Sequence, residues 1–332
     1  MPCASPDPRG SPAPRIAVVV PCFDDGAVLV EAVTSLRDQE PCEVVVVDDG
    51  SNDDGTLEVL RALEAQGVTV VHQANQGPSA ARNTGVAVTT APYVFPLDAD
   101  DAVFPQSLTA LADVLDRDPE LAVVWGRSAR FGKGLNSPPG PLRVDQLDPW
   151  RITYLNEIPG AALIRRTALA EVSGWRDGTG YEDWDLWLAL AEHGHRGRGV
   201  DVPVQRYRLH GSRRWEHVSS RHGRVYAELR AAHTELWKGR RRHWLASQSS
   251  WRARLLLPAA DALPMSRRGR WRLFHVLLHT RRVLRDDLVG SVKARWRRRW
   301  GATGGPSGRA RGHLPAWASV HRPGRRGPSA RG

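Results

Sequence analysis

Short apolar segments alternate with longer amphipathic ones through the first hundred residues. The apolar segments are rich in β-branched residues and predict buried strands at 16–20, 44–47, 68–71 and 93–97. The amphipathic segments predict helices at 28–36, 53–66 and 79–88. Asp53 or Asp54 can cap the second helix, and Gly67 can end it. A strand and a helix that repeat every ~25 to 30 residues are typical of an α/β fold, with a mostly parallel central sheet flanked by helices.

After residue 101 the pattern becomes less regular. Helices are expected at 105–117 and 182–192, and strands at 121–125, 160–164 and 200–209. Between them, 131–149 contains four prolines and several glycines and is expected to be a loop.

The charge of the chain divides it near residue 210. Residues 1–210 hold 18 Lys and Arg against 30 Asp and Glu, a net charge of −12, whereas 211–332 hold 29 against 6, a net charge of +23. Eight of the thirteen tryptophans lie from 215 to 317. We therefore expect a disordered N-terminus at 1–14, a catalytic domain at 15–212, a basic helical extension at 213–300 and a disordered tail at 301–332.

The cysteines and the hydropathy indicate the compartment. Cys3, Cys22 and Cys42 form no metal-binding or disulfide pattern, which favours a reducing environment. The N-terminal segment lacks the apolar stretch of a secretion signal, and no run of about 18 apolar residues occurs. These features predict a cytoplasmic protein, either free or peripheral at the inner face of the cell membrane.

Acidic clusters follow two of the expected strands. Asp98 and Asp100 end the strand at 93–97, and two carboxylates on a turn at the carboxyl edge of a parallel sheet can hold Mg²⁺ or Mn²⁺. Asp48 and Asp49 follow the strand at 44–47 and should emerge at the same edge, where an Asp can accept from a nucleobase N–H. Both clusters could instead be solvated turns that cap the following helices.

Several ordered motifs together resemble the family 2 glycosyltransferases, from about residue 16 to residue 210. The motifs are Val18-Val19-Val20-Pro21-Cys22-Phe23, Val47-Asp48-Asp49-Gly50-Ser51, Asn75-Gln76-Gly77-Pro78-Ser79-Ala80-Ala81-Arg82-Asn83, Leu97-Asp98-Ala99-Asp100-Asp101 and Gly180-Tyr181-Glu182-Asp183-Trp184-Asp185-Leu186-Trp187. The resemblance implies a GT-A type nucleotide-sugar-binding fold, an inverting mechanism and a divalent metal, Mn²⁺ or Mg²⁺.

The resemblance also implies roles for individual residues. Asp183 would be the catalytic base that takes the proton of the acceptor hydroxyl. The remaining assignments are donor binding by Pro21, Phe23, Asp48, Asp49, Arg82 and Asp98, metal binding by Asp98, Asp100 and His210, and acceptor binding by Glu182, Trp184 and Trp187. Acidic residues also favour the first turn of a helix, and the two tryptophans could be ordinary packing residues. His210 could equally be structural.

Two departures from the family pattern refine the prediction. Phe23 and Asp24 stand where many relatives have Tyr-Asn, which removes a hydroxyl near the nucleobase. Gly211-Ser212-Arg213-Arg214-Trp215 replaces the Gln-x-x-Arg-Trp motif of processive synthases, so a single transfer to a glycan or lipid-linked acceptor is favoured.

The basic extension leaves alternatives open. Its Arg and Trp residues could contact an anionic membrane surface, pack on the acidic catalytic domain or remain partly disordered. A nucleic-acid-binding protein would explain this region but not the acidic clusters, so no specific nucleic acid is expected. A sugar nucleotidyltransferase would ordinarily carry a basic glycine-rich loop after the first strand, where 21–26 is acidic instead.

Overall fold

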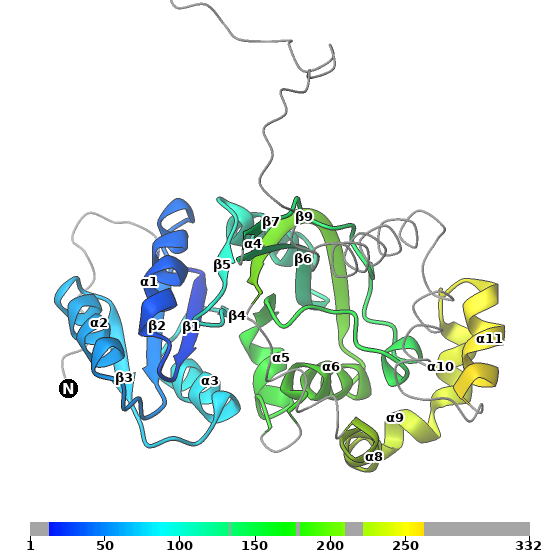
Figure 1. The fold of residues 1–332 in the computed structure, drawn as a ribbon. Helices are drawn as coiled ribbons and strands as arrows, with labels where there is room; N and C mark the ends of the chain where they lie inside the picture. The colour runs from blue at the N-terminus through cyan, green and yellow to red at the C-terminus, as the bar shows by residue number, and fades with distance from the viewer. Residues whose placement is uncertain (1–12, 133, 177–179, 210–221, 262–332) are drawn as a thin grey trace, which may run out of the picture. The chain divides into compact units, whose positions relative to one another are not determined.

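The computed structural model describes residues 13–132, 134–176, 180–209 and 222–261. These residues form a mixed sheet with the strand order β3-β2-β1-β4-β8-β6-β9-β5, and β7 pairs with β6 (Figure 1). The strands are β1 (Ile16–Cys22), β2 (Glu43–Asp48), β3 (Thr69–His72), β4 (Tyr93–Pro96), β5 (Ala102–Val103), β6 (Leu121–Gly132), β7 (Leu135–Asn136), β8 (Ala162–Arg165) and β9 (Arg196–Arg208). The helices are α1 (Gly26–Thr34), α2 (Asp54–Ala65), α3 (Pro78–Ala87), α4 (Ser107–Arg117), α5 (Arg166–Glu171), α6 (Glu182–Glu192), α8 (His222–Ala232), α9 (Thr234–Lys238), α10 (Arg240–Ala246) and α11 (Trp251–Asp261).

The first half of the sheet is parallel, as the strand and helix alternation predicts. β1 pairs in parallel with β2 and β4, and β2 pairs in parallel with β3. Consecutive residues of β1 enter different cores, since Val18 packs into one apolar cluster and Val19 into another. A strand buried on both faces has no polar positions, which explains the uninterrupted apolar sequence. α3 packs closely on β1, because a Cβ at Gly85 would lie 2.2 Å from Cγ1 of Val19.

The second half of the sheet departs from the simple parallel pattern. β8 is antiparallel to both β4 and β6, while β6 and β9 run parallel. β6 and β9 are longer than the expected strands at 121–125 and 200–209, and α5 was not predicted. The ends of these strands alternate buried and exposed residues, with arginines at exposed positions, so they lack the solid apolar signal of a buried strand.

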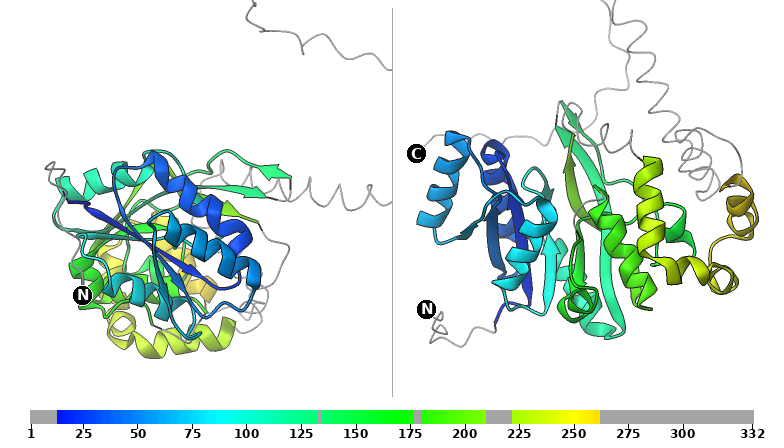
Figure 2. Two further views of the ribbon diagram at one scale, coloured as in Figure 1. Left: turned by 90° about the vertical axis from the view of Figure 1, so that its left-hand side faces the viewer. Right: turned by 90° about the horizontal axis from the view of Figure 1, so that it is seen from below.

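The basic extension is helical over 222–261 and packs on the rest of the described chain. The hydroxyl of Tyr226 in α8 donates to the carbonyl of Thr153 at 2.8 Å. Ala253 and Leu257 of α11 are buried in an apolar cluster with Trp150. Helices α8 to α11 lie at the opposite end of the molecule from α1 and α2 (Figure 2). For 222–261 the structure therefore shows packing on the catalytic domain, one of the three alternatives.

Several expectations fall on other parts of the chain. The disorder expected at 1–14 and 301–332 falls on residues outside the described ranges, apart from Ala13 and Pro14. The other parts of the basic extension, 213–221 and 262–300, also lie outside these ranges. Among the helices of the described ranges, none combines the length and the apolar character needed to cross a bilayer.

Candidate active site

The carboxyl ends of the parallel strands bring the predicted donor residues to one edge of the sheet. Cys22 at the end of β1 is in register with Asp48 at the end of β2, and Asp48 is in register with His72 of β3. The backbone N–H of Asp49 donates to the carbonyl of Cys22 at 2.8 Å. Asp98 follows β4, the other neighbour of β1. The strand order thus places both acidic clusters on the same edge.

Asp48 and Asp49 are both buried and hydrogen-bonded within the protein. Asp48 accepts from the backbone N–H of Ser51 at 2.9 Å and contacts Nδ1 of His72 at 2.8 Å. Burial opposes the charged form, but these hydrogen bonds prevail and lower the pKa of Asp48 below its ordinary value. In this structure the carboxylate of Asp48 therefore connects the loop after β2 to the end of β3.

Asp49 holds the loop that leads into α3. Its carboxylate accepts from Nε2 of Gln73 at 2.7 Å and from the backbone N–H groups of Gln76 and Gly77 at 2.9 and 2.8 Å. Gly50, with φ +79°, allows this approach, because a Cβ there would lie 2.8 Å from the backbone nitrogen of Asn75. Direct contact of either aspartate with a nucleobase stays a prediction.

Pro21 and Phe23 lie at the end of β1, which is in register with the end of β2. The ring of Phe23 is 43 % exposed, which makes it accessible for stacking on a base, whereas Pro21 is half-buried. Asp24 has φ +55°, and one of its carboxylate oxygens accepts from the backbone N–H groups of Asn52 and Asp53. The departure from Tyr-Asn at these positions therefore supplies an anchor for the loop after β2.

The second acidic cluster brings three carboxylates together. Asp98, Asp100 and Asp101 each offer a carboxylate oxygen, and these oxygens lie within 4.8 Å of one another. Burial raises the pKa of Asp101 well above its ordinary value, and the charges of Asp98 and Asp100 raise it further. A concentration of negative charge on hard oxygen ligands fits Mg²⁺ or Mn²⁺.

Asp101 was not assigned a role from the sequence. It is 1 % exposed and accepts from Nε2 of Gln205 at 2.6 Å and from the backbone N–H of Arg208 at 2.8 Å, both in β9. The motif contained Asp101, but strand alternation alone does not show that β9 returns to this turn. The third carboxylate became evident only once the sheet order was known.

Arg82 connects the two halves of the site. This guanidinium, on α3, pairs with Asp98 at 2.6 Å and with Glu182 of α6 at 3.3 Å. The residue is 7 % exposed, and its Nε has no hydrogen-bond partner among the described residues. Burial disfavours the charged form, but the two carboxylates outweigh it and raise the pKa of Arg82, so the cation persists. A buried cation with an unused N–H suits an anionic ligand.

Asp183 lies at the start of α6 and has both carboxylate oxygens engaged. One accepts from the backbone N–H of Trp184 at 2.7 Å, and the other accepts from Nδ2 of Asn156 at 3.0 Å. Burial, reinforced by the charge of Glu182, raises the pKa of Asp183 to about 6. A carboxylate with a pKa near 6 is ionised at neutral pH and is a stronger base than an ordinary aspartate.

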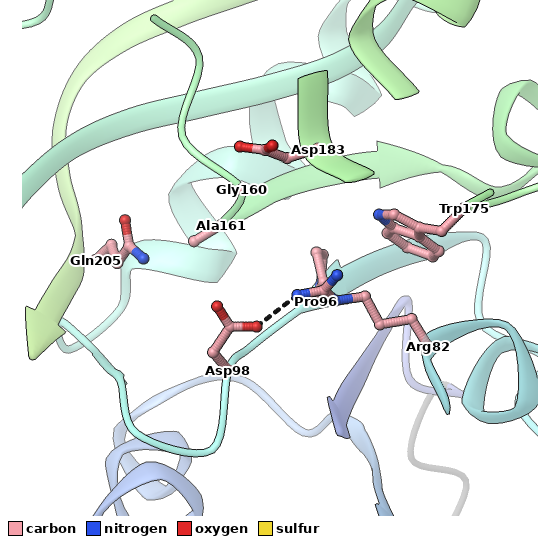
Figure 3. Close-up of a pocket in the computed structure, with 8 residues that line it drawn as sticks. All are labelled: Arg82, Pro96, Asp98, Gly160, Ala161, Trp175, Asp183 and Gln205. Carbon is pink, nitrogen blue, oxygen red and sulfur yellow. Dashed lines mark hydrogen bonds and ion pairs between the residues drawn. The ribbon is translucent and has the colours of Figure 1, made fainter. Parts of the chain in front are cut away.

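A pocket unites groups from α3, β4 and the turn after it, the segment before β8, α6 and β9 (Figure 3). Its lining residues are Arg82, Pro96, Asp98, Gly160, Ala161, Trp175, Asp183 and Gln205. Asp98 and Asp183, 85 positions apart in the sequence, thus face one cavity from β4 and α6. Asp48, Asp49 and Phe23 do not line it, and they lie along the sheet edge beside it.

The predicted acceptor residues divide into two groups. Glu182 lies beside the pocket and pairs with Arg82. Trp184 and Trp187 are only 4 % and 1 % exposed and belong to an apolar core, so the structure corrects their assignment to acceptor stacking. Aromatic residues three apart on a helix face pack inward when that face covers a core. His210, the third predicted metal ligand, lies outside the described residues.

Asn156 and Gly160 were missed from the sequence. Asn156 lies in the irregular segment before β8, and Gly160 was expected to begin the strand at 160–164, which in the structure is β8 (Ala162–Arg165). No single-sequence signal distinguishes the asparagine that contacts Asp183 from any other loop asparagine.

Comparisons with known proteins agree with this geometry. The fold is similar to the crystal structure of S. aureus TarS 1–349 in complex with UDP-GlcNAc, with a TM-score of 0.53, 18 % identity and coverage of 78 % of this chain and 70 % of that one. The fold is therefore of the GT-A type. Residues 17–173 match the model of glycosyl transferase family 2, which confirms the predicted resemblance to this family.

Two relatives show the extent of the similarity. The uncharacterized glycosyltransferase YibD of Escherichia coli (strain K12) is 34 % identical over 113 residues, which are 32 % of this chain and 33 % of YibD. The pre-mycofactocin glycosyltransferase of Mycobacterium tuberculosis (strain ATCC 25618 / H37Rv) is 31 % identical over 210 residues, which are 59 % of this chain and 43 % of that protein. The matched part thus spans less than half the length of these relatives.

Proposed function

We propose that this protein is an inverting glycosyltransferase that moves one sugar from a nucleotide-diphosphate sugar to a hydroxyl acceptor with the help of a divalent metal. The observation that carries the proposal is the shared pocket of Asp98, Arg82 and Asp183. It combines a carboxylate of the acidic cluster, a buried cation and a carboxylate with a raised pKa, which are the groups that this reaction needs.

The metal would be held by Asp98 and Asp100, with Asp101 as a further carboxylate of the same cluster. When bound, Mn²⁺ or Mg²⁺ supplies Lewis-acid stabilisation of the negative charge on the diphosphate. Arg82 is placed to add a fixed positive charge on the same side, since it already contacts Asp98. Donor binding thus depends both on the carboxylates that would hold the metal and on the guanidinium of Arg82.

Asp183 acts as the general base. The acceptor oxygen attacks the anomeric carbon and forms the new C–O bond, while the bond between that carbon and the diphosphate oxygen breaks and its electron pair leaves with the diphosphate. The hydroxyl proton passes to the carboxylate of Asp183, which needs to be ionised beforehand. Attack opposite the leaving group inverts the anomeric configuration. Asn156 and the backbone N–H of Trp184 hold the carboxylate in position.

The acceptor is proposed to be a glycan or a lipid-linked saccharide, and the transfer a single addition. The chain lacks the Gln-x-x-Arg-Trp motif of the processive synthases. The described helices 222–261 form a basic surface beside α6, and contact of the C-terminal region with an anionic membrane would bring a cytoplasmic enzyme to a lipid-linked acceptor.

The proposal is tested with Asp183→Asn. Donor binding, measured by calorimetry with Mn²⁺ and the UDP-, GDP- or dTDP-sugar that most raises the melting temperature, should match the wild-type protein. Transfer to the acceptor should fall by roughly 10²- to 10⁴-fold, because the general base is lost. Full turnover by this variant would assign the base to another residue. Failure of every nucleotide-sugar to bind the wild-type protein would reject the transferase itself.

A further inference from the structure

The outer face of α11 combines exposed apolar residues with an arginine. Trp251, Leu255 and Leu256 are 70 %, 62 % and 40 % exposed, and Arg252 lies exposed between them. Because 251 and 255, and likewise 252 and 256, are one helical turn apart, these four side chains form one continuous surface, here named the α11 face. The opposite side of the helix carries Ala253 and Leu257, which are buried.

The charge around the α11 face is mainly positive. Residues 235–261 contain six Lys and Arg residues against Glu235, which pairs with Lys238, and Asp261, a net charge of +4. In α10, Arg241 and Arg242 are exposed beside Leu245, which is 62 % exposed. The indole N–H of Trp244 donates to the carbonyl of Arg254 at 2.8 Å, which holds α10 next to α11. Exposed apolar side chains, a tryptophan and an excess of cations are the composition of helices that lie in the interface of anionic bilayers.

Charge distinguishes a bilayer from the other occupants of this face. Residues 262–332 of the same chain hold 18 Lys and Arg against 2 Asp, a net charge of +16, so they are not electrostatically complementary to it. Two copies of the chain that met through their α11 faces would oppose cation to cation. An anionic lipid surface complements both the charge and the apolar side chains.

Buried polar contacts connect the helices that carry the α11 face to the rest of the described chain, including α6. Asp148 accepts from the hydroxyls of Ser247 and Ser249, which precede α11. His233, 1 % exposed, contacts Asp185 at 3.1 Å through Nε2 and Glu192 at 2.9 Å through Nδ1, and both carboxylates belong to α6. The His233 contacts tie the junction of α8 and α9 to α6, whose second residue is the proposed base, and the Asp148 contacts hold the segment before α11.

We propose that the α11 face is a docking surface for an anionic lipid bilayer, which sets the orientation of α6 and its pocket relative to the membrane. Trp251, Leu255 and Leu256 enter the interfacial region, and Arg252 with the arginines of α10 contacts the anionic headgroups. The proposal assigns a partner and a specific surface to the extension, and it holds whether or not the pocket performs glycosyl transfer.

The test is co-sedimentation of the full chain with vesicles. Wild-type protein should bind vesicles that contain phosphatidylglycerol, should bind pure phosphatidylcholine far less, and should lose binding as salt rises. Trp251→Ser combined with Leu255→Ser should reduce binding to the anionic vesicles by roughly tenfold, since two apolar groups that enter the bilayer are lost. Arg242→Ser combined with Arg252→Ser should reduce it by a similar factor and flatten the salt dependence.

The matched control is Val30→Ser combined with Val88→Ser. These valines are 48 % and 51 % exposed, comparable to the apolar residues of α11, but they lie on α1 and after α3. The control should bind vesicles like the wild-type protein. Donor affinity measured by calorimetry should be unchanged in every variant, which separates a failure of this proposal from a failure of the transferase proposal.

Three results would overturn the inference. The α11 variants could bind anionic vesicles as well as the wild-type protein, which would place the contact elsewhere in the chain. They could dissociate a dimer in sedimentation velocity without changing vesicle binding, which would make the face a contact between copies. They could instead lose salt-sensitive retention on DNA and leave vesicle binding intact, which would favour a nucleic acid.

Discussion

The two sides of the pocket are built in different ways. On the donor side, Asp98 directly follows β4, and the parallel register with β1 is enough to bring it to the sheet edge. On the acceptor side, Asp183 contacts Asn156 from 27 positions earlier, and α6 is held by His233 from 48 positions after Asp185. The donor side therefore depends on local strand geometry, whereas the acceptor side depends on contacts between distant segments.

The largest effect should come from the donor side. Asp98→Asn removes a carboxylate from the cluster and the partner of Arg82, so we expect kcat/KM to fall by about 1,000-fold, or ~4 kcal/mol of transition-state stabilisation. Steady-state kinetics with titrated Mn²⁺ measures it. Asp201→Asn is the control, because that aspartate is 84 % exposed and pairs with Arg127 away from the pocket lining. Equal losses in the two variants would show that the effect is nonspecific.

The acceptor side should be more sensitive to the loss of a distant contact. His233→Ala leaves the buried carboxylate of Asp185 with Arg176 alone, and we expect the free energy of unfolding to fall by about 3 kcal/mol. Urea denaturation measures the loss. Lys238→Ala, which breaks an exposed pair with Glu235 in α9, should leave the stability unchanged. Unaltered stability in the His233 variant would mean that the extension does not support α6.

A smaller effect should appear in the pH dependence. Asn156→Ala removes an N–H that donates to the charged form of Asp183, so its pKa should rise above about 6. Because the base has to be deprotonated, the acid limb of the kcat/KM profile should move to higher pH by roughly one pH unit. Asn156→Asp should move it further, since a second carboxylate opposes ionisation. Asn136→Ala, on the exposed strand β7, is the control and should leave the pH profile unchanged. An unchanged profile in Asn156→Ala would mean that the hydrogen bond from Asn156 does not affect the pKa of Asp183.

The smallest effect concerns the sheet edge. The pKa of Asp48 is lowered in the folded protein, so its contribution to stability is present above the ordinary pKa and is lost as the pH falls through the folded value. Asp48→Asn should cost about 1 kcal/mol at neutral pH through a weakened hydrogen bond. The difference from the wild-type protein should shrink below about pH 4, in urea titrations at several pH values. A difference that stays constant with pH would argue against the charged contact with His72.

Much of the donor half could be predicted because its signals are local. The solid apolar strands, the cap at Asp53 and the left-handed Gly67 with φ +87° all appear in the structure where the pattern indicates them. The end of β6 and the start of β9 were not predicted, because arginines and glycines there interrupt the apolar pattern. The choice between packing and acceptor binding for Trp184 and Trp187 stayed open, because the sequence does not show which face of α6 meets a core.

The sequence by itself determined the α/β class, the order of the acidic motifs and the family, because strand period, helix caps and motif spacing are properties of neighbouring residues. Only the tertiary structure decided that Gln205 and Arg208 hold Asp101, that Asn156 holds Asp183 and that His233 ties the basic extension to α6. Each of these contacts joins residues brought together by the return of the chain to the same sheet or helix. Such a return depends on packing over the whole domain, which no local pattern encodes.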